Sequence, residues 1–195
     1  MRRPSGIDAP SPTRWPRKVL AMAGLFALIC FGLQAWRLFS LSATYDQALF
    51  LQELWATAQG RPFESSLSSV LSGAVVVGDG LPSIDYLHLG QHANVLTVLM
   101  APLVAVFGMW ALPLLQVGLL TGAGLVLWRL ADSRLPRPLA ERITLAYFLS
   151  GAVIGPALEN FHDLVWLPFL AFLVVGGLLD GCRWRVCLFG ALLML

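Results

Sequence analysis

The stretch ALPLLQVGLLTGAGLVLWRL occupies residues 111–130 and carries a single charged side chain, Arg129. About 20 consecutive apolar residues are enough for a helix to cross the roughly 30 Å of hydrocarbon in a bilayer. Similar apolar runs cover 19–36, 139–158 and 164–179, and a last run from 184 to 195 stops short of that length. We therefore predict an all-α fold, a polytopic bundle of transmembrane helices with four complete spans.

The composition of the whole chain agrees with a lipid environment. Of its 195 residues, 57% are hydrophobic and only 12% are charged, which leaves too little polar surface to coat a water-soluble domain. The formal net charge is +2, so the overall electrostatics do not support nucleic-acid binding, and we expect none. Cys30, Cys182 and Cys187 lack the paired spacing of a zinc site, and we interpret them as structural.

The positions of the charges predict which side of the membrane each loop faces. Basic residues gather in the head 1–18, in the connection 129–142 and in the turn 183–185. If the apolar segment 92–107 crosses the membrane, the connection 129–142 falls outside, against the positive-inside rule. If this short segment, which contains Pro102, lies in the outer interface instead, all three basic groups face the cytoplasm. We adopt the second arrangement, with a cytoplasmic N-terminus in the cell membrane.

This arrangement divides the chain into a flexible basic head, 1–18, and a helical domain, 19–195, whose outer loop covers 41–110. Within the loop, 45–60 has the spacing of an amphipathic helix, which we expect to lie flat on the membrane like the segment 92–107. Its predicted apolar face consists of Leu51, Leu54, Trp55 and Ala58. Because the last apolar run is too short to cross, we interpret the sequence as the N-terminal part of a longer protein.

Asp46 follows directly after the first predicted span, at the start of the amphipathic helix. A carboxylate in the first turn of a helix is favoured by the free N–H groups and the helix dipole, which is a purely structural interpretation. The alternative is a general base or a metal-binding carboxylate at a cleft that faces the lipid headgroups. The sequence leaves both interpretations open.

Two further polar clusters lie on the same predicted outer side. Asp85, His88 and His92 have the spacing i, i+3, i+7, so a helix through them would present three ligands for a divalent metal, although simple hydration is the alternative. The second cluster lies between two spans and consists of Glu159, Asn160, His162 and Asp163. Two acids, an amide and a histidine within five positions make a better site candidate than any single residue.

Several short motifs occur in a fixed order along the chain: Tyr45-Asp46, Phe50, Gln52, Trp55, Gly60, His92 leading into 99–103, Gln116, and Phe161-His162. In this order they resemble the domain-of-unknown-function 2079 family of polytopic prokaryotic membrane proteins, which are considered relatives of the C superfamily of membrane glycosyltransferases. The resemblance covers about residues 41–195. The family often has an acid directly before the Phe-His pair, where this chain has Asn160.

The resemblance implies transfer of a sugar from a polyprenyl-phosphate donor to an acceptor on the outer membrane face. Asp46 would be the base or a metal ligand, and His92 and His162 would contact substrate beside Glu159 and Asp163. The cofactor stays open, with a divalent metal suggested by these side chains.

A non-enzymatic transport or assembly subunit is the alternative function. Polar groups at mid-bilayer would favour transport, and the sequence has few of them, chiefly Gln34, Gln116 and Thr121. Clustering of polar residues at the outer interface favours the enzyme.

Overall fold

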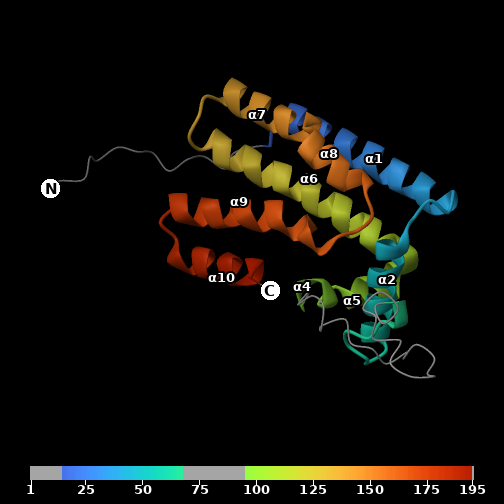
Figure 1. Ribbon diagram of the computed structural model, residues 1–195. Coiled ribbons are helices and arrows are strands. Elements are labelled where there is room, and N and C mark those ends of the chain that lie inside the picture. The colour runs from blue at the N-terminus through green and yellow to red at the C-terminus, as the bar shows by residue number, and fades with distance from the viewer. Residues whose placement is uncertain (1–14, 68–94, 195) are drawn as a thin grey trace, which may run out of the picture.

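The computed structural model describes residues 15–67 and 95–194, and within these two ranges the chain folds into helices without a strand. The all-α prediction is therefore confirmed. The helices of the main bundle are α1 (Arg17–Phe39), α6 (Ala111–Asp132), α7 (Arg137–Leu149), α8 (Gly151–Leu158), α9 (Trp166–Leu179) and α10 (Arg183–Leu193). In Figure 1, α6 lies between α1, α7 and α9, and α10 returns along α9.

The outside of this bundle is apolar, as a lipid environment requires. The buried residues of α1 form one stripe at helical spacing: Val19, Ala23, Phe26, Cys30 and Gln34. The rest of the helix is also hydrophobic but points outward; the Leu28 side chain, for example, is 71% exposed. Two helical runs, Arg17–Phe39 and Ala101–Asp132, are long and apolar enough to cross a membrane. A helix that is hydrophobic all round and packed on one side only fits a bilayer better than water.

The predicted span 139–158 is not one continuous helix. Ser150 separates α7 from α8, because its backbone is extended and its hydroxyl accepts a hydrogen bond from the Ala152 N–H at 3.3 Å. Pro156 inside α8 lacks an N–H and crowds the carbonyl one turn earlier, which further disfavours an uninterrupted helix. Counting apolar residues cannot detect such an N-cap, so the break is a correction to the sequence-based prediction.

The segment before α6 is not one long helix in its described part. It forms two short helices, α4 (Val95–Val98) and α5 (Ala101–Phe107), followed by the 3₁₀ turn η2 (Gly108–Trp110). Gly108 has a φ of 56°, the left-handed region that favours glycine, and the chain changes direction there. Seven residues of α5 span only about 10 Å, so this helix stays at one end of the bundle, beside α2.

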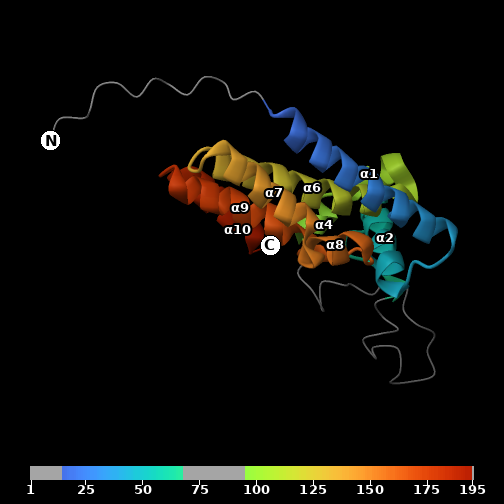
Figure 2. The same cartoon turned by 90° about the horizontal axis from the view of Figure 1, so that it is seen from above.

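The amphipathic helix predicted at 45–60 is present as α2 (Tyr45–Ala58), but its buried face differs from the prediction. Leu54 is buried as expected, whereas Trp55 is 52% exposed and Ala58 is exposed. Glu53, which is not one of the residues of the predicted apolar face, is fully buried. The neighbours of α2 decide which face is covered, and periodicity alone did not reveal them. Figure 2 shows α2 running across the end of the bundle, an orientation compatible with a helix in the interface.

The loops gather at the two ends of the bundle according to their charge. One end, termed the basic end, contains the start of α1, the α6–α7 connection and the α9–α10 turn (Figure 1). It carries Arg17, Lys18, Arg129, Arg134, Arg137, Arg142, Arg183 and Arg185. The opposite end, termed the pocket end, contains α2 and the α8–α9 connection. The basic segments that the sequence predicted to share one side therefore lie, in their described part, at one end of the fold.

Candidate functional site

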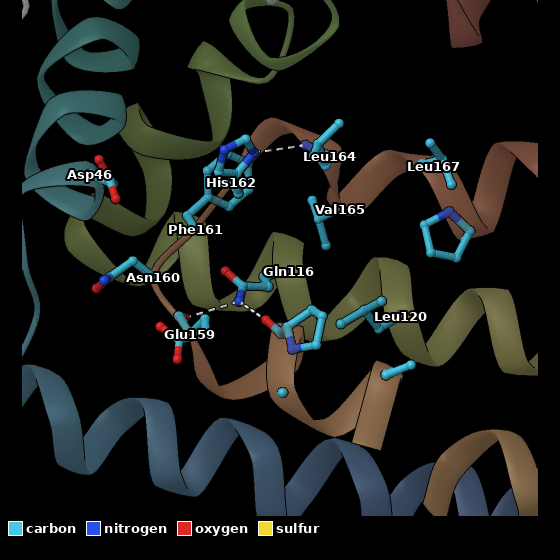
Figure 3. Close-up of a pocket in the computed structure, with 14 residues that line it drawn as sticks. Asp46, Gln116, Leu120, Glu159, Asn160, Phe161, His162, Leu164, Val165 and Leu167 are labelled. Carbon is cyan, nitrogen blue, oxygen red and sulfur yellow. Dashed lines mark hydrogen bonds between the residues drawn. The ribbon is translucent and has the colours of Figure 1, made fainter. Parts of the chain in front are cut away.

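A pocket of about 610 Å³ opens at the pocket end (Figure 3). It lies between the start of α2, the first half of α6, α8 and the α8–α9 connection. Three of the residues singled out from the sequence line it together: Asp46, Glu159 and His162. Its remaining lining residues are Gln116, Leu120, Ala152, Gly155, Pro156, Asn160, Phe161, Leu164, Val165, Leu167 and Pro168. Residues that are 116 positions apart in the sequence thus meet at one site.

Asp46 is in the first turn of α2, and its side chain is exposed at the pocket. The N-cap residue Thr44 makes no side-chain cap bond to this helix, so a carboxylate in the first turn is the group that complements the free N–H groups and the dipole. The structural interpretation of Asp46 is therefore supported. Its position on the pocket wall leaves the chemical interpretation equally available.

The α8–α9 connection supplies the other polar lining residues. Glu159 and His162 are exposed, and the chain between them is extended rather than helical. The His162 Nδ1 atom lies 2.5 Å from a carboxylate oxygen of Asp163 and 3.3 Å from the Leu164 N–H. Asp163 does not line the pocket, although its carboxylate lies next to the imidazole that does. The fourth predicted contact residue, His92, lies outside the described residues.

Three contacts fix this connection against the start of α2 and its N-cap. The Phe161 N–H donates to the Gln47 side-chain oxygen at 2.9 Å, and the Phe161 ring packs edge-on against Phe50 with 5.3 Å between centroids. The Thr44 N–H donates to the Asn160 side-chain oxygen at 3.1 Å. Because Asp46 lies between Thr44 and Gln47 in the chain, these contacts place it beside the connection.

A family model described as "Predicted membrane protein (DUF2079)" matches residues 37–195. The chain belongs to this family. Every residue that lines the pocket lies within the matched range. The resemblance expected from the sequence motifs is confirmed, and the chain is accordingly a helical membrane protein. No curated protein and no solved structure matches the chain.

The deeper wall of the pocket in this DUF2079 protein is apolar. Leu120 from α6, Ala152 from α8 and Leu167 from α9 continue it away from the polar residues, as Figure 3 shows for Leu120 and Leu167. The pocket therefore presents carboxylates and an imidazole at its outer edge and hydrocarbon along the bundle. That combination suits an amphiphile, whose polar group stays at the interface while its chain lies among helices.

Metal ligands are not concentrated in the described part of this DUF2079 chain. Residues 15–67 and 95–194 contain no group of three or more His, Cys, Asp or Glu side chains close enough to hold an ion. Asp46 and Glu159 are the pocket carboxylates with which a divalent cation could interact. The triad predicted from spacing, Asp85, His88 and His92, lies outside the described residues.

Tyr45, next to Asp46, helps to hold the outer loop in place. Burial raises the pKa of its phenol, and the neighbouring Asp46 carboxylate acts in the same direction. The hydroxyl is thus kept protonated and donates to the backbone carbonyl of Leu67. This bond links the start of α2 to the segment that follows it.

Sequence reasoning did not single out Arg37 as part of the site. The Arg37 guanidinium donates to the carbonyl of Leu158 and, at 2.9 Å, to the side-chain oxygen of Asn160. The available signal was a cation at the end of an apolar run, where a charge is costly unless it is paired or reaches the interface. The positive-inside rule assigns the other arginines to one side of the membrane, but it says nothing about the hydrogen-bond partners of an arginine.

Proposed function

We propose that this protein transfers a sugar from a polyprenyl-phosphate donor to an acceptor at the outer face of the cell membrane, with Asp46 as the general base. The observation that carries the proposal is the pocket itself, which combines Asp46, Glu159 and His162 with an apolar wall at one end of a helical membrane bundle. A lipid-linked sugar has the same division into a polar head and a hydrocarbon chain.

The chemistry required of the pocket is a displacement at the anomeric carbon of the donor. Asp46 takes the proton from an acceptor hydroxyl, whose oxygen forms the new bond to that carbon as the carbon–oxygen bond to the lipid phosphate breaks. The lipid phosphate leaves with the bonding electron pair. Glu159, His162, His92 and Asp163 would contact sugar or phosphate. If a divalent cation accompanies the phosphate, Asp46 would be one of its ligands instead.

The proposed orientation follows from the charges at the two ends. The basic end, with its eight arginine and lysine side chains, would face the cytoplasm, and the pocket end would face outward. A polyprenyl-phosphate donor in the outer leaflet would then approach the pocket from the lipid.

Transport is the second candidate, and the break between α7 and α8 is the observation that favours it. Interrupted helices are common at the binding sites of transporters, where helix ends contact the substrate. However, the two buried amides expected at mid-bilayer, Gln34 and Gln116, donate to backbone carbonyls of the α8 end. Side chains committed to the backbone in this way are poor candidates for lining a pathway, which supports the enzyme.

Replacement of Asp46 by asparagine tests the proposal. Asp46→Asn keeps the size of the side chain and its ability to accept bonds at the helix start, but it cannot take a proton. We expect sugar transfer from a panel of polyprenyl-phosphate donors to fall by about a hundredfold or more, with unchanged expression. The measurement compares purified wild type and variant at equal concentrations.

Glu64→Gln is the control, because Glu64 is an acid of the same outer loop that pairs with Arg61 at 3.1 Å and does not line the pocket. It should transfer sugar at the wild-type rate. Wild-type activity in Asp46→Asn would leave Asp46 as a helix-start residue only. If the wild type transfers sugar from none of the donors, the result favours transport over sugar transfer.

A further inference from the structure

The end of α8 has an unusual set of hydrogen-bond partners. Four consecutive backbone carbonyls, from Pro156 to Glu159, accept bonds from side chains of two other helices. Gln34 of α1 donates to Ala157 at 2.9 Å and to Glu159 at 2.7 Å, and Arg37 donates to Leu158. Gln116 of α6 donates to Pro156 and, at 3.1 Å, to Glu159, as the dashed lines in Figure 3 show.

These bonds answer a physical requirement of a short helix inside a membrane bundle. The last carbonyls of any helix lack partners within the helix, and a water-exposed helix leaves them to solvent. Here Gln34 and Gln116 are 3% and 2% exposed, so their amides replace water as donors. The positive charge of Arg37 also lies at the negative end of the α8 dipole.

The same contacts continue into the pocket wall. Beyond the carbonyls, Arg37 holds the Asn160 side chain, which also accepts from the Thr44 N–H, and the Asn160 amide donates to the Thr44 hydroxyl. The Phe161 N–H is held by Gln47. The stretch 156–161 is thus attached residue by residue to α1, α2 and α6, although Glu159 itself projects an exposed side chain into the pocket.

We propose that Gln34, Arg37 and Gln116 are positioning residues: together they cap α8 and hold the stretch 156–161 so that Glu159 and His162 face Asp46 across the pocket. This inference rests on the proposed function for its catalytic consequence, but not for its structural part. Arg37 carries the most specific role, because its planar fork reaches a backbone carbonyl and a side-chain oxygen at once. A lysine has one compact charge and cannot reproduce that geometry.

The structural part is tested by the accessibility of a buried thiol, which does not depend on activity. Ala157 is fully buried, and its carbonyl is one of the four that are capped, so Ala157→Cys introduces a nearly isosteric reporter. The background replaces Cys30, Cys182 and Cys187. Loss of a charged hydrogen bond raises the local opening equilibrium by about tenfold or more, so Arg37→Gln should speed thiol labelling by that factor. Arg37→Lys should resemble Arg37→Gln.

Two further variants keep the test decisive. Arg61→Gln removes an arginine of the outer loop whose guanidinium contacts Glu64 and the Trp55 ring, and it should leave labelling unchanged. Asn160→Asp keeps the side-chain oxygen that accepts from both Arg37 and the Thr44 N–H, so it should preserve protection of the thiol. This variant keeps the inference testable if the Arg37 variants fail to fold. Unchanged labelling in Arg37→Gln, or lost protection in Asn160→Asp, overturns the inference.

Activity then separates this inference from the proposed function. For a positioning residue, Arg37→Gln and Arg37→Lys should both lower kcat with less effect on donor KM, and the control Arg61→Gln should stay close to wild type. If Arg37 instead bound the donor phosphate, Arg37→Lys would largely restore activity and labelling would not change, which contradicts positioning. If the Arg37 variants are labelled faster but the wild type transfers no sugar, the capping of α8 is upheld and the proposed function is rejected.

Discussion

The two ends of the bundle are held together by different interactions. At the basic end, Asp180 pairs with Arg134 at 3.2 Å and with Arg185 at 3.5 Å, and all three side chains are at least one-third exposed. At the pocket end, buried amides and a half-buried guanidinium donate to backbone carbonyls. Exposed ion pairs contribute little to stability, whereas a buried carbonyl left without its donor is costly.

This difference separates two tasks that polar residues perform in a membrane bundle. The charges of the basic end decide which side of the membrane it occupies, and the partner of each charge matters little for that purpose. The polar residues of the pocket end, Gln34, Arg37 and Gln116, decide the path of the chain at the site. For these three residues the hydrogen-bond acceptor is essential, because the hydrocarbon region of a membrane offers no water to replace it.

The strongest test of the comparison is whether the two ends lie on opposite sides of the membrane. We introduce single cysteines at Ser68, Ser133 or Glu159 into a background without other cysteines and treat intact cells with a membrane-impermeant thiol reagent. Ser68→Cys and Glu159→Cys should be labelled from outside, and Ser133→Cys, at the basic end, should not. Labelling of Ser133→Cys together with Ser68→Cys would mean that 92–107 crosses the membrane.

A smaller effect is expected from removing one buried donor at the pocket end. Gln116→Leu leaves the Pro156 carbonyl without the side chain that caps it, at a cost of about 1–3 kcal/mol. The midpoint of thermal aggregation in detergent should fall by about 3–10 °C. The matched control is Gln59→Leu, because Gln59 is exposed at the end of α2 and should tolerate the same change. Equal midpoints for the two variants would refute the importance of the cap.

The smallest effect should come from the basic end. Asp180→Asn removes both ion pairs of Asp180 at once, yet exposed pairs contribute roughly 0–1 kcal/mol. The variant should aggregate within about 3 °C of wild type, and the remaining difference should shrink in high salt because exposed charges are screened. A loss as large as that of Gln116→Leu would erase the distinction between the two ends.

Much of the fold was predictable because hydrophobic length and charge are visible in a single sequence. The helices and the gathering of arginines at one end both follow from them, and the interfacial position of the segment before α6 stays a prediction. The break at Ser150 did not follow, because an N-cap inside an apolar run leaves the hydrophobic count unchanged. The burial of Glu53 did not follow either, since the packing partners of α2 determine its buried face.

The candidate site divides in the same way. Asp46, Glu159 and His162 were recognisable as polar residues at the predicted outer interface, and the fold brings all three to one pocket. Arg37 was missed because its partners are about 120 residues away, and no local pattern connects them. Gln34 and Gln116 were noticed as buried amides, but their acceptors are backbone atoms, whose positions depend on tertiary structure.

The long sequence separation between Gln34 and its acceptor has a consequence for how the protein is made. The Gln34 amide bonds a carbonyl 123 residues further along the chain, so α1 is synthesised well before its partner exists. At about 5–20 residues per second, the interval is roughly 6–25 s. During that time the first helix carries an amide and a guanidinium whose acceptors have not yet been synthesised. Arrival of α8 then completes the pairing, and a nascent chain that stalls before residue 156 would keep this polar face open to membrane quality control.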